Sequence, residues 1–206
     1  MIVTFGAGGM SEAFDGVKIP HSECDVRDIA EVASVMDAYR PSVVIVTAGV
    51  SHPDSIARGR FEEEISTNLL GAFNVAQIAV NFDVETLIFI ASVAGLHGKP
   101  NHASYCASKA GVISLVQSLA HEGYNAYAIS PGRVDTPMRE RDYPSDTPGS
   151  RLKPERVWDV VLSILAGEYQ PGDNILLRKI GLDYITEYAV PVPFKDELRV
   201  GEPVSI

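Results

Sequence analysis

The sequence predicts an α/β fold, a doubly wound parallel sheet with helices on both faces in a three-layer α/β/α arrangement. Short β-branched runs alternate with longer segments of helical period along the 206 residues. Runs such as 43–46 and 87–90 are apolar at every position, which is typical of parallel strands covered on both faces. Right-handed crossovers between such strands give a doubly wound sheet.

The apolar runs and the periodic segments place the individual elements. Strands are expected at 2–5, 43–47, 87–91, 124–129 and 175–177, and helices over 28–39, 61–81, 103–122 and 154–166. Pro154 suits the first turn of the last helix, where a missing N–H costs nothing. The segment 137–153 has turn residues without an apolar period, which predicts a substrate lid, and 188–206 is expected to be an irregular arm. We expect one domain over 1–206.

Composition narrows the class of protein. With 46% hydrophobic residues and a formal net charge of −10, the chain favours a globular fold and disfavours nucleic acid and membranes as partners. The apolar runs are too short to cross a bilayer, and no charged leader follows Met1. Two cysteines without metal-ligand spacing fit a reducing compartment, so we expect a cytoplasmic protein without a metal.

A glycine-rich turn follows the first strand. Gly6, Gly8, Gly9 and Met10 lie where backbone N–H groups approach a dinucleotide pyrophosphate. Glu12 stands where a third glycine is usual, and the segment 11–16 is too short for a normal crossover helix. No acidic or basic partner for the ribose follows the next strand, so NAD and NADP cannot be separated.

The catalytic candidates are Ser92, Tyr105 and Lys109. Tyr105 and Lys109 are four residues apart on one predicted helix, so phenol and ammonium share a face. A phenol with an ordinary pKa of about 10 needs a nearby cation to serve as an acid–base group near neutral pH. Ser92, at the end of a strand, is placed to hydrogen-bond a substrate oxygen as charge develops on it.

This pattern resembles the Ser…Tyr-x-x-x-Lys signature of the short-chain dehydrogenase/reductase family, including the thirteen positions from Ser92 to Tyr105. Four further segments resemble family motifs in the same order: Asp25-Val26, Thr47-Ala48-Gly49, Asn68, and the loop Pro131-Gly132-Arg133-Val134-Asp135-Thr136. The resemblance extends over residues 1 to 180, and it implies a Rossmann-type fold.

The resemblance also implies roles. Tyr105 is the acid–base, Ser92 polarises the carbonyl, Lys109 lowers the tyrosine pKa and holds the nicotinamide ribose, and Asn68 anchors a water in a proton relay. The cofactor-binding residues are Gly6, Gly8, Gly9, Met10, Asp25, Val26, Ala48, Gly49, Tyr105, Lys109, Pro131, Gly132, Val134 and Thr136. The implied reaction is NAD(P)-dependent hydride transfer with a small carbonyl or alcohol substrate, in a homodimer or homotetramer.

Departures from the family pattern leave alternatives open. Thr47 replaces an asparagine, and Tyr127 stands where another asparagine is usual. One alternative is a non-catalytic binding protein with a degenerate cofactor site, and another is an epimerase or dehydratase that uses NAD without net redox. The arginines at 133, 139, 141 and 151 suit a clamp for a substrate carboxylate or phosphate, but we favour a solvated loop whose charge is balanced by Glu140, Asp142 and Asp146. His97 and His102 are interpreted as solvent-facing or loop-stabilising residues.

Overall fold

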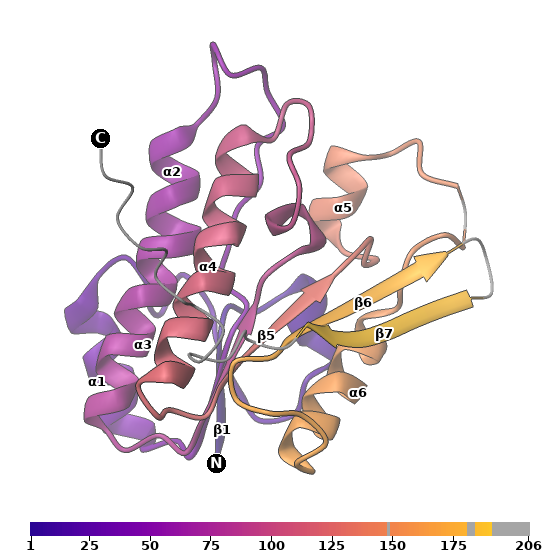
Figure 1. The fold of residues 1–206 in the computed structure, drawn as a ribbon. Coiled ribbons are helices and arrows are strands. Elements are labelled where there is room, and N and C mark those ends of the chain that lie inside the picture. Colours follow the sequence, from indigo (N-terminus) through magenta and orange to yellow (C-terminus); the bar gives the residue numbers. More distant parts are fainter. Residues whose placement is uncertain (148, 181–183, 191–206) are drawn as a thin grey trace, which may run out of the picture.

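The computed structural model describes residues 1–147, 149–180 and 184–190 of the chain. Within these residues, one sheet has the strand order β2-β1-β3-β4-β5-β6-β7 (Figure 1). The strands are β1 (Ile2–Phe5), β2 (Val17–Ile19), β3 (Val43–Val46), β4 (Thr86–Ile90), β5 (Ala126–Pro131), β6 (Asn174–Ile180) and β7 (Tyr184–Val190). Neighbouring strands from β2 to β6 are parallel, and β7 is antiparallel to β6. The predicted doubly wound parallel sheet is therefore confirmed.

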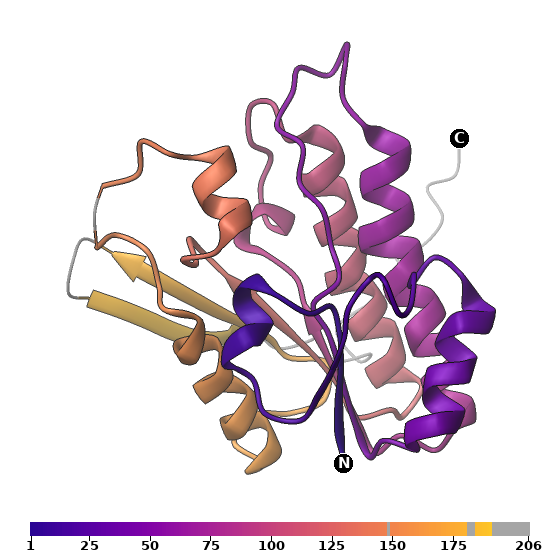
Figure 2. The same cartoon turned by 180° about the vertical axis from the view of Figure 1, so that it is seen from behind.

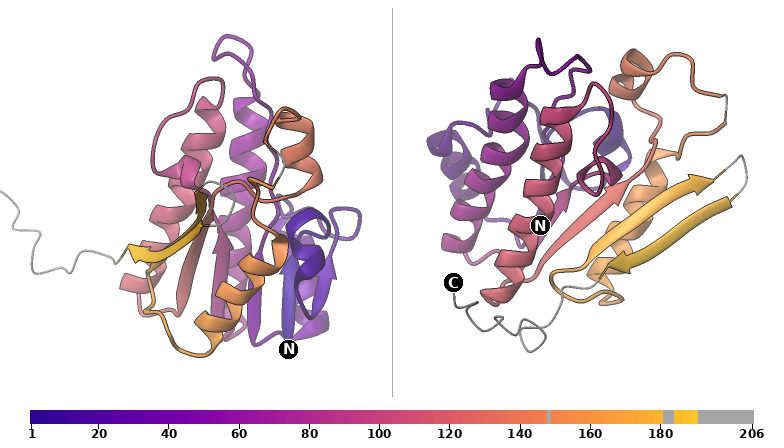
Figure 3. Two further views of the ribbon diagram at one scale, coloured as in Figure 1. Left: turned by 90° about the vertical axis from the view of Figure 1, so that its right-hand side faces the viewer. Right: turned by 45° about the horizontal axis from the view of Figure 1, so that its top comes forward.

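Helices cover both faces of the sheet. They are α1 (Ile29–Tyr39), α2 (Phe61–Ile65), the π-helical turn η2 (Ser66–Leu70), α3 (Gly71–Asn81), α4 (Ala103–His121), α5 (Pro137–Asp142) and α6 (Pro154–Leu165), with short 3-10 turns η1 (Gly9–Ala13) and η3 (Val93–Gly95). Figure 2 shows the face on which α6 packs beside η1. Seen edge-on, α4 and α6 lie on opposite sides of the sheet, which completes the three layers (Figure 3).

Alternation along the strands builds two cores. Val44 packs under α1, α3 and α4, whereas its neighbour Ile45 packs under α6. Successive side chains of a strand point to opposite faces, so a run of four apolar residues in β3 serves both cores at once. This explains why the central strands are apolar at every position.

The crossover between β1 and β2 is as short as predicted, and η1 is its only helical turn among the described residues. Phe14, which is 2% exposed, follows this turn and stacks on Trp158 of α6 with ring centroids 5.4 Å apart. The buried aromatic pair fixes the crossover against the sheet, and with it the adjacent glycine turn.

Four elements differ from the prediction. α5 lies inside the segment 137–153, which was predicted to be a loop. β6 extends beyond 175–177, and β7 reaches Val190, so the predicted irregular arm begins with strand residues; 191–206 lie outside the described residues. The helix expected over 61–81 is continuous but widens into the π turn at its middle. Within the described part of the chain, no helix is long and apolar enough to cross a bilayer.

Candidate active site

A cavity of about 950 Å³ opens at the carboxyl ends of β1, β3, β4 and β5. This is the edge of an open α/β sheet at which ligands bind, and the volume is at the upper end for a small-molecule site. The cavity is lined by Ser92 and by every predicted cofactor-binding residue except Asp25: Gly6, Gly8, Gly9, Met10, Val26, Ala48, Gly49, Tyr105, Lys109, Pro131, Gly132, Val134 and Thr136.

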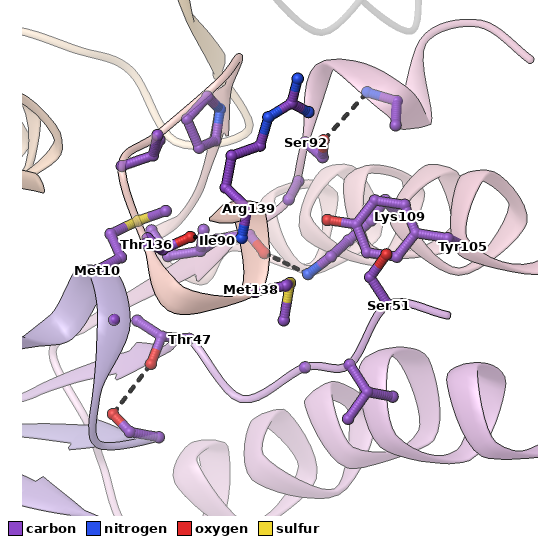
Figure 4. Close-up of a pocket in the computed structure, with 18 of the residues that line it drawn as sticks. Met10, Thr47, Ser51, Ile90, Ser92, Tyr105, Lys109, Thr136, Met138 and Arg139 are labelled. Carbon is purple, nitrogen blue, oxygen red and sulfur yellow. Dashed lines mark hydrogen bonds between the residues drawn. The ribbon is translucent and has the colours of Figure 1, made fainter. Parts of the chain in front are cut away.

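Ser92, Tyr105 and Lys109 come together at one end of this cavity (Figure 4). The Ser92 hydroxyl oxygen accepts a hydrogen bond from the Ala94 backbone N–H at 3.1 Å, which caps η3 and fixes the side chain at the strand end. Tyr105 and Lys109 follow on successive turns of α4. The Lys109 ammonium donates to the carbonyl oxygen of Ile90 at 2.8 Å and lies 5.9 Å from the centre of the Tyr105 ring.

Burial dominates the electrostatics of this pair. Burial raises the pKa of Tyr105 to about 12; a hydrogen bond with Ser92 opposes this, and the charge of Glu64 adds to it. Burial also lowers the pKa of Lys109 to about 8. Lys109 is not among the causes of the Tyr105 shift, and its ammonium bonds to Ile90, so the lowering of the tyrosine pKa by Lys109 stays a prediction.

Asn68 does not line the cavity but holds the loop that does. Its side-chain oxygen accepts from the Val50 N–H at 2.7 Å, and its amide nitrogen donates to the Val50 carbonyl at 2.9 Å and to Ser108 Oγ at 3.0 Å. A Cβ on Gly49 would lie 3.1 Å from Asn68 Oδ1 and 3.5 Å from Lys109 Nζ. Asn68 thus positions the strand-end loop beside Lys109; the predicted water relay stays a prediction.

The glycine turn is held by side chains. Gly6 has φ of +108°, and the Thr47 hydroxyl donates to its carbonyl at 3.0 Å, which ties the ends of β1 and β3 together. This contact accounts for a threonine where the family resemblance expects asparagine. The Gly8 N–H donates to Ser11 Oγ at 3.1 Å, and the Gly9 N–H donates to a carboxylate oxygen of Glu12 at 3.2 Å.

Asp25 lies outside the cavity, contrary to the prediction for adenine contact. Its carboxylate pairs with the Arg27 guanidinium at 2.6 Å, and this hydrogen bonding holds the pKa of Asp25 at about 2. Arg27, Val26 and His21 line the cavity instead. The turn after β2 therefore presents a basic rather than an acidic side chain to the far end of the cavity.

The fit to a dinucleotide rests on this continuous cavity, which joins the glycine turn to Tyr105 and Lys109. Glycines with positive φ give the close backbone approach that a pyrophosphate requires. Glu12 is the one acidic side chain among those lining the cavity at this turn. Among the described residues, no cluster of His, Cys, Asp or Glu is placed to hold a metal.

The segment 137–153 covers one side of the cavity through α5 and the residues after it. Arg139 pairs with Asp146 at 2.7 Å, and Arg151 pairs with Asp146, Glu140 and Asp135, which gives the expected charge balance. Their side chains are only 16% and 13% exposed, so the expectation that these two arginines are solvated is wrong. Arg139 also lines the cavity. Its guanidinium carbon lies 3.6 Å from the ring centre of Tyr143.

Sequence reasoning missed the neighbours of Tyr143. Its hydroxyl lies 2.5 Å from His102 Nε2, and the two rings stack with centroids 5.7 Å apart. The His102 ring in turn meets the Tyr105 ring edge-on at 6.4 Å. The spacing of His102, three residues before Tyr105 on the same helix start, was the available signal, since residues i and i+3 share a face.

The fold and site define a Rossmann-type protein whose cavity fits a dinucleotide. The chain belongs to the short chain dehydrogenase family, which it matches over residues 9–146. The comparisons confirm the predicted family.

Two curated relatives carry names of reductases. The chain is 33% identical over 172 residues to 3-oxoacyl-[acyl-carrier-protein] reductase FabG of Thermotoga maritima, covering 74% of this chain and 69% of the relative. It is 36% identical over 152 residues to the reductase MabA of Mycobacterium tuberculosis, covering 66% of this chain and 60% of the relative. The chain therefore spans less than two thirds of the length of MabA.

Solved structures share the fold. A 3-oxoacyl-[acyl-carrier protein] reductase with bound NAD from Brucella melitensis has a TM-score of 0.70 at 22% identity, covering 85% of this chain and 88% of that one. A short chain dehydrogenase from Burkholderia cenocepacia in complex with NADP has a TM-score of 0.70 at 17% identity, covering 85% and 86%. At these identities the likeness shows the shared fold.

Proposed function

We propose that this chain is an NAD(P)-dependent oxidoreductase that interconverts a small carbonyl compound and its alcohol, with Tyr105 as the acid–base. The observation that carries the proposal is the convergence of Ser92, Tyr105 and Lys109 on one cavity that continues to the glycine turn. The oxidoreductase names of the curated relatives support it.

When bound, NAD(P) supplies or accepts a hydride at C4 of its nicotinamide ring. In reduction, Ser92 donates a hydrogen bond to the substrate oxygen, and the Tyr105 hydroxyl gives that oxygen its proton as the carbon receives the hydride. In oxidation, the Tyr105 phenolate takes the proton from the alcohol. Lys109 would hold the ribose of the bound cofactor, and its positive charge would stabilise the phenolate as it forms.

The cofactor would be held by the cavity-lining residues of the glycine turn, of the loop at 47–50 and of the loop at 131–136. Its pyrophosphate would lie at Gly8, Gly9 and Met10, where Glu12 must give up the Gly9 N–H. Either dinucleotide remains a candidate, since Arg27 and His21 at the far end suit a phosphate and also tolerate a hydroxyl.

Assembly and location complete the proposal. A homodimer or homotetramer formed through α2, α3 and α4 would cover Phe61 and Phe73, which are 62% and 49% exposed. Both cysteines are free, and the acidic net charge disfavours anionic surfaces, which supports a cytoplasmic location. The segment 137–153 would serve as the substrate lid of a single domain.

Tyr105→Phe tests the mechanism directly. With NADH or NADPH and a panel of ketones and aldehydes, loss of cofactor absorbance reports turnover. The variant is expected to lose at least about a hundredfold in kcat/KM, while its affinity for the cofactor is retained. Tyr124→Phe, at the far end of α4, is the matched control and is expected to match the wild type. Undiminished turnover by Tyr105→Phe would overturn the mechanism.

A further inference from the structure

The cavity is basic within an acidic chain. Of the described residues that line it, seven are lysine or arginine and three are acidic: Arg27, Lys99, Lys109, Arg133, Arg139, Arg178 and Lys179 against Glu12, Glu63 and Asp142. The whole chain has the opposite balance, with 27 acidic and 17 basic residues. A cleft lined by one sign of charge concentrates ligands of the other sign. The proposed dinucleotide accounts for an anion at the glycine turn but not at the lid.

Lys99 is a basic cavity-lining side chain that lies beside the lid and contacts Tyr143. It lies half-buried between η3 and α4, and its ammonium is 3.5 Å from the Tyr143 hydroxyl and 5.3 Å from the centre of that ring. Among the described residues it forms no ion pair, whereas the nearby Arg139 is paired with Asp146. A partly desolvated ammonium gains from a bound anion.

The surroundings hold Lys99 in place through Tyr143 and His102. His102 Nδ1 lies 2.8 Å from the Pro100 carbonyl oxygen, which only accepts, so Nδ1 is the donor of this contact. The Tyr143 hydroxyl lies within hydrogen-bond distance of His102 Nε2, and its oxygen accepts from the Lys99 ammonium at 3.5 Å. Within the described part of the chain the Lys99 ammonium makes no other hydrogen bond, so its remaining N–H groups can reach a ligand.

This cluster adjoins the proposed reaction centre. The rings of His102 and Tyr105 lie 6.4 Å apart, and Lys99, His102, Tyr143 and Tyr105 all line the same cavity. Consider a substrate whose carbonyl oxygen is hydrogen-bonded to Ser92 and Tyr105. If the rest of that substrate is directed toward the lid, it approaches Lys99.

We propose that the substrate carries an acidic group, a carboxylate or a phosphate, near its carbonyl, and that Lys99 binds this group. Tyr143 and His102 act as positioning residues for the ammonium. The inference rests on the proposed oxidoreductase function and names its substrate class.

The test uses pairs of carbonyl compounds that differ in the acid alone. Pyruvate, acetoacetate and levulinate are each compared with their methyl esters, and dihydroxyacetone phosphate is compared with dihydroxyacetone. The readout is the ratio of kcat/KM for the acid to that for its neutral partner. For at least one pair, the ratio is expected to favour the acid and to fall by roughly tenfold or more in Lys99→Met, because a charge-assisted contact is lost. The pair with the largest ratio shows whether the bound acid is a carboxylate or a phosphate. Among the keto acids, it also shows how many carbons separate the carboxylate from the carbonyl.

Arg58→Met is the charge control, since it removes one positive charge from an exposed side chain that lies outside the lid and does not line the cavity. It is expected to leave the ratio unchanged, and Tyr143→Phe is expected to lower it less than Lys99→Met does. A ratio that Lys99→Met leaves unchanged, or that favours the neutral partner in every pair, would overturn the inference. If no compound turns over with either cofactor, the proposed function fails instead. In that case, calorimetric titration of the wild type and of Lys99→Met with levulinate and with dihydroxyacetone phosphate tests the anion site separately. The anion site is overturned if neither compound binds to the wild type, or if both compounds bind equally well to the two proteins.

Discussion

The carboxylate of Glu12 accepts a hydrogen bond from the backbone N–H of Gly9 at 3.2 Å. The acid thus occupies a donor of the glycine turn that the proposed function assigns to the cofactor pyrophosphate. The resemblance to the family expects glycine at position 12, so the contact is a feature of this chain. A pyrophosphate and a carboxylate that compete for one N–H also repel each other.

Glu12→Gln is expected to tighten the binding of NADH or NADPH by roughly three- to tenfold, because it removes a like charge while keeping the side chain's shape. Fluorescence titration of the purified proteins measures the change. Asp15→Asn, at an exposed acid that does not line the cavity, removes the same charge nearby and is expected to have little effect. Equal or weaker binding by Glu12→Gln would refute the competition.

Lys109→Met is expected to stabilise the fold while abolishing turnover. Burial lowers the pKa of Lys109 from its ordinary value of 10.5 to about 8. Between these values the unfolded chain holds a proton that the folded chain has released, so wild-type stability rises with pH across this window. Below about pH 8 the cost of the buried charge is fully present, and the variant should gain on the order of 1–3 kcal/mol in unfolding free energy at pH 7.

Urea unfolding of both proteins at several pH values checks the sign. The stability difference should be largest at neutral pH and should shrink toward pH 10. A variant that is less stable than the wild type at neutral pH would show that the Ile90 contact outweighs the desolvation of Lys109.

The pKa of Tyr105, raised to about 12 by burial, predicts different pH profiles for the two directions of the reaction. Reduction uses the neutral phenol, which prevails at neutral pH, so kcat/KM for reduction should be nearly flat from about pH 6 to pH 8. Oxidation uses the phenolate, so its kcat/KM should rise across the same range. Parallel profiles in both directions would contradict Tyr105 as the titrating group.

Asn68→Ala is expected to destabilise the chain by about 2–4 kcal/mol and to lower turnover, because it removes the buried amide that pairs with the backbone N–H and carbonyl of the half-buried Val50. Chemical unfolding and kcat are the two measurements. Asn81→Ala, which removes one exposed contact to Gln77, serves as the comparison and should cost far less. Equal losses in the two variants would show that Asn68 does not position the loop.

Local sequence patterns were sufficient to predict the sheet and the helix that carries Tyr105 and Lys109. Continuous apolar runs locate β3 and β4 because these strands are buried on both faces, and the spacing of Tyr105 and Lys109 places both on one face of α4. The short crossover after Gly6 also follows from counting residues.

Contacts between residues that are far apart in the sequence could not be predicted from such local patterns. Tyr143 and His102 are 41 residues apart and meet only because α5 folds over the helix start. The π turn carries Asn68, whose side chain bonds to Val50, 18 residues away. The Asp25 carboxylate pairs with the Arg27 guanidinium and does not line the cavity. The place of Asp25 in the sequence motif does not predict this pairing.

Calorimetric titration of the purified protein with NAD, NADH, NADP and NADPH tests the central claim most directly, since Tyr105 has a partner for its chemistry only if a nicotinamide binds beside it. The proposed function predicts saturable binding of at least one dinucleotide, with similar affinity in the wild type and in Tyr105→Phe. No measurable binding of any of the four would contradict it and would leave a Rossmann-type fold whose cavity serves another ligand.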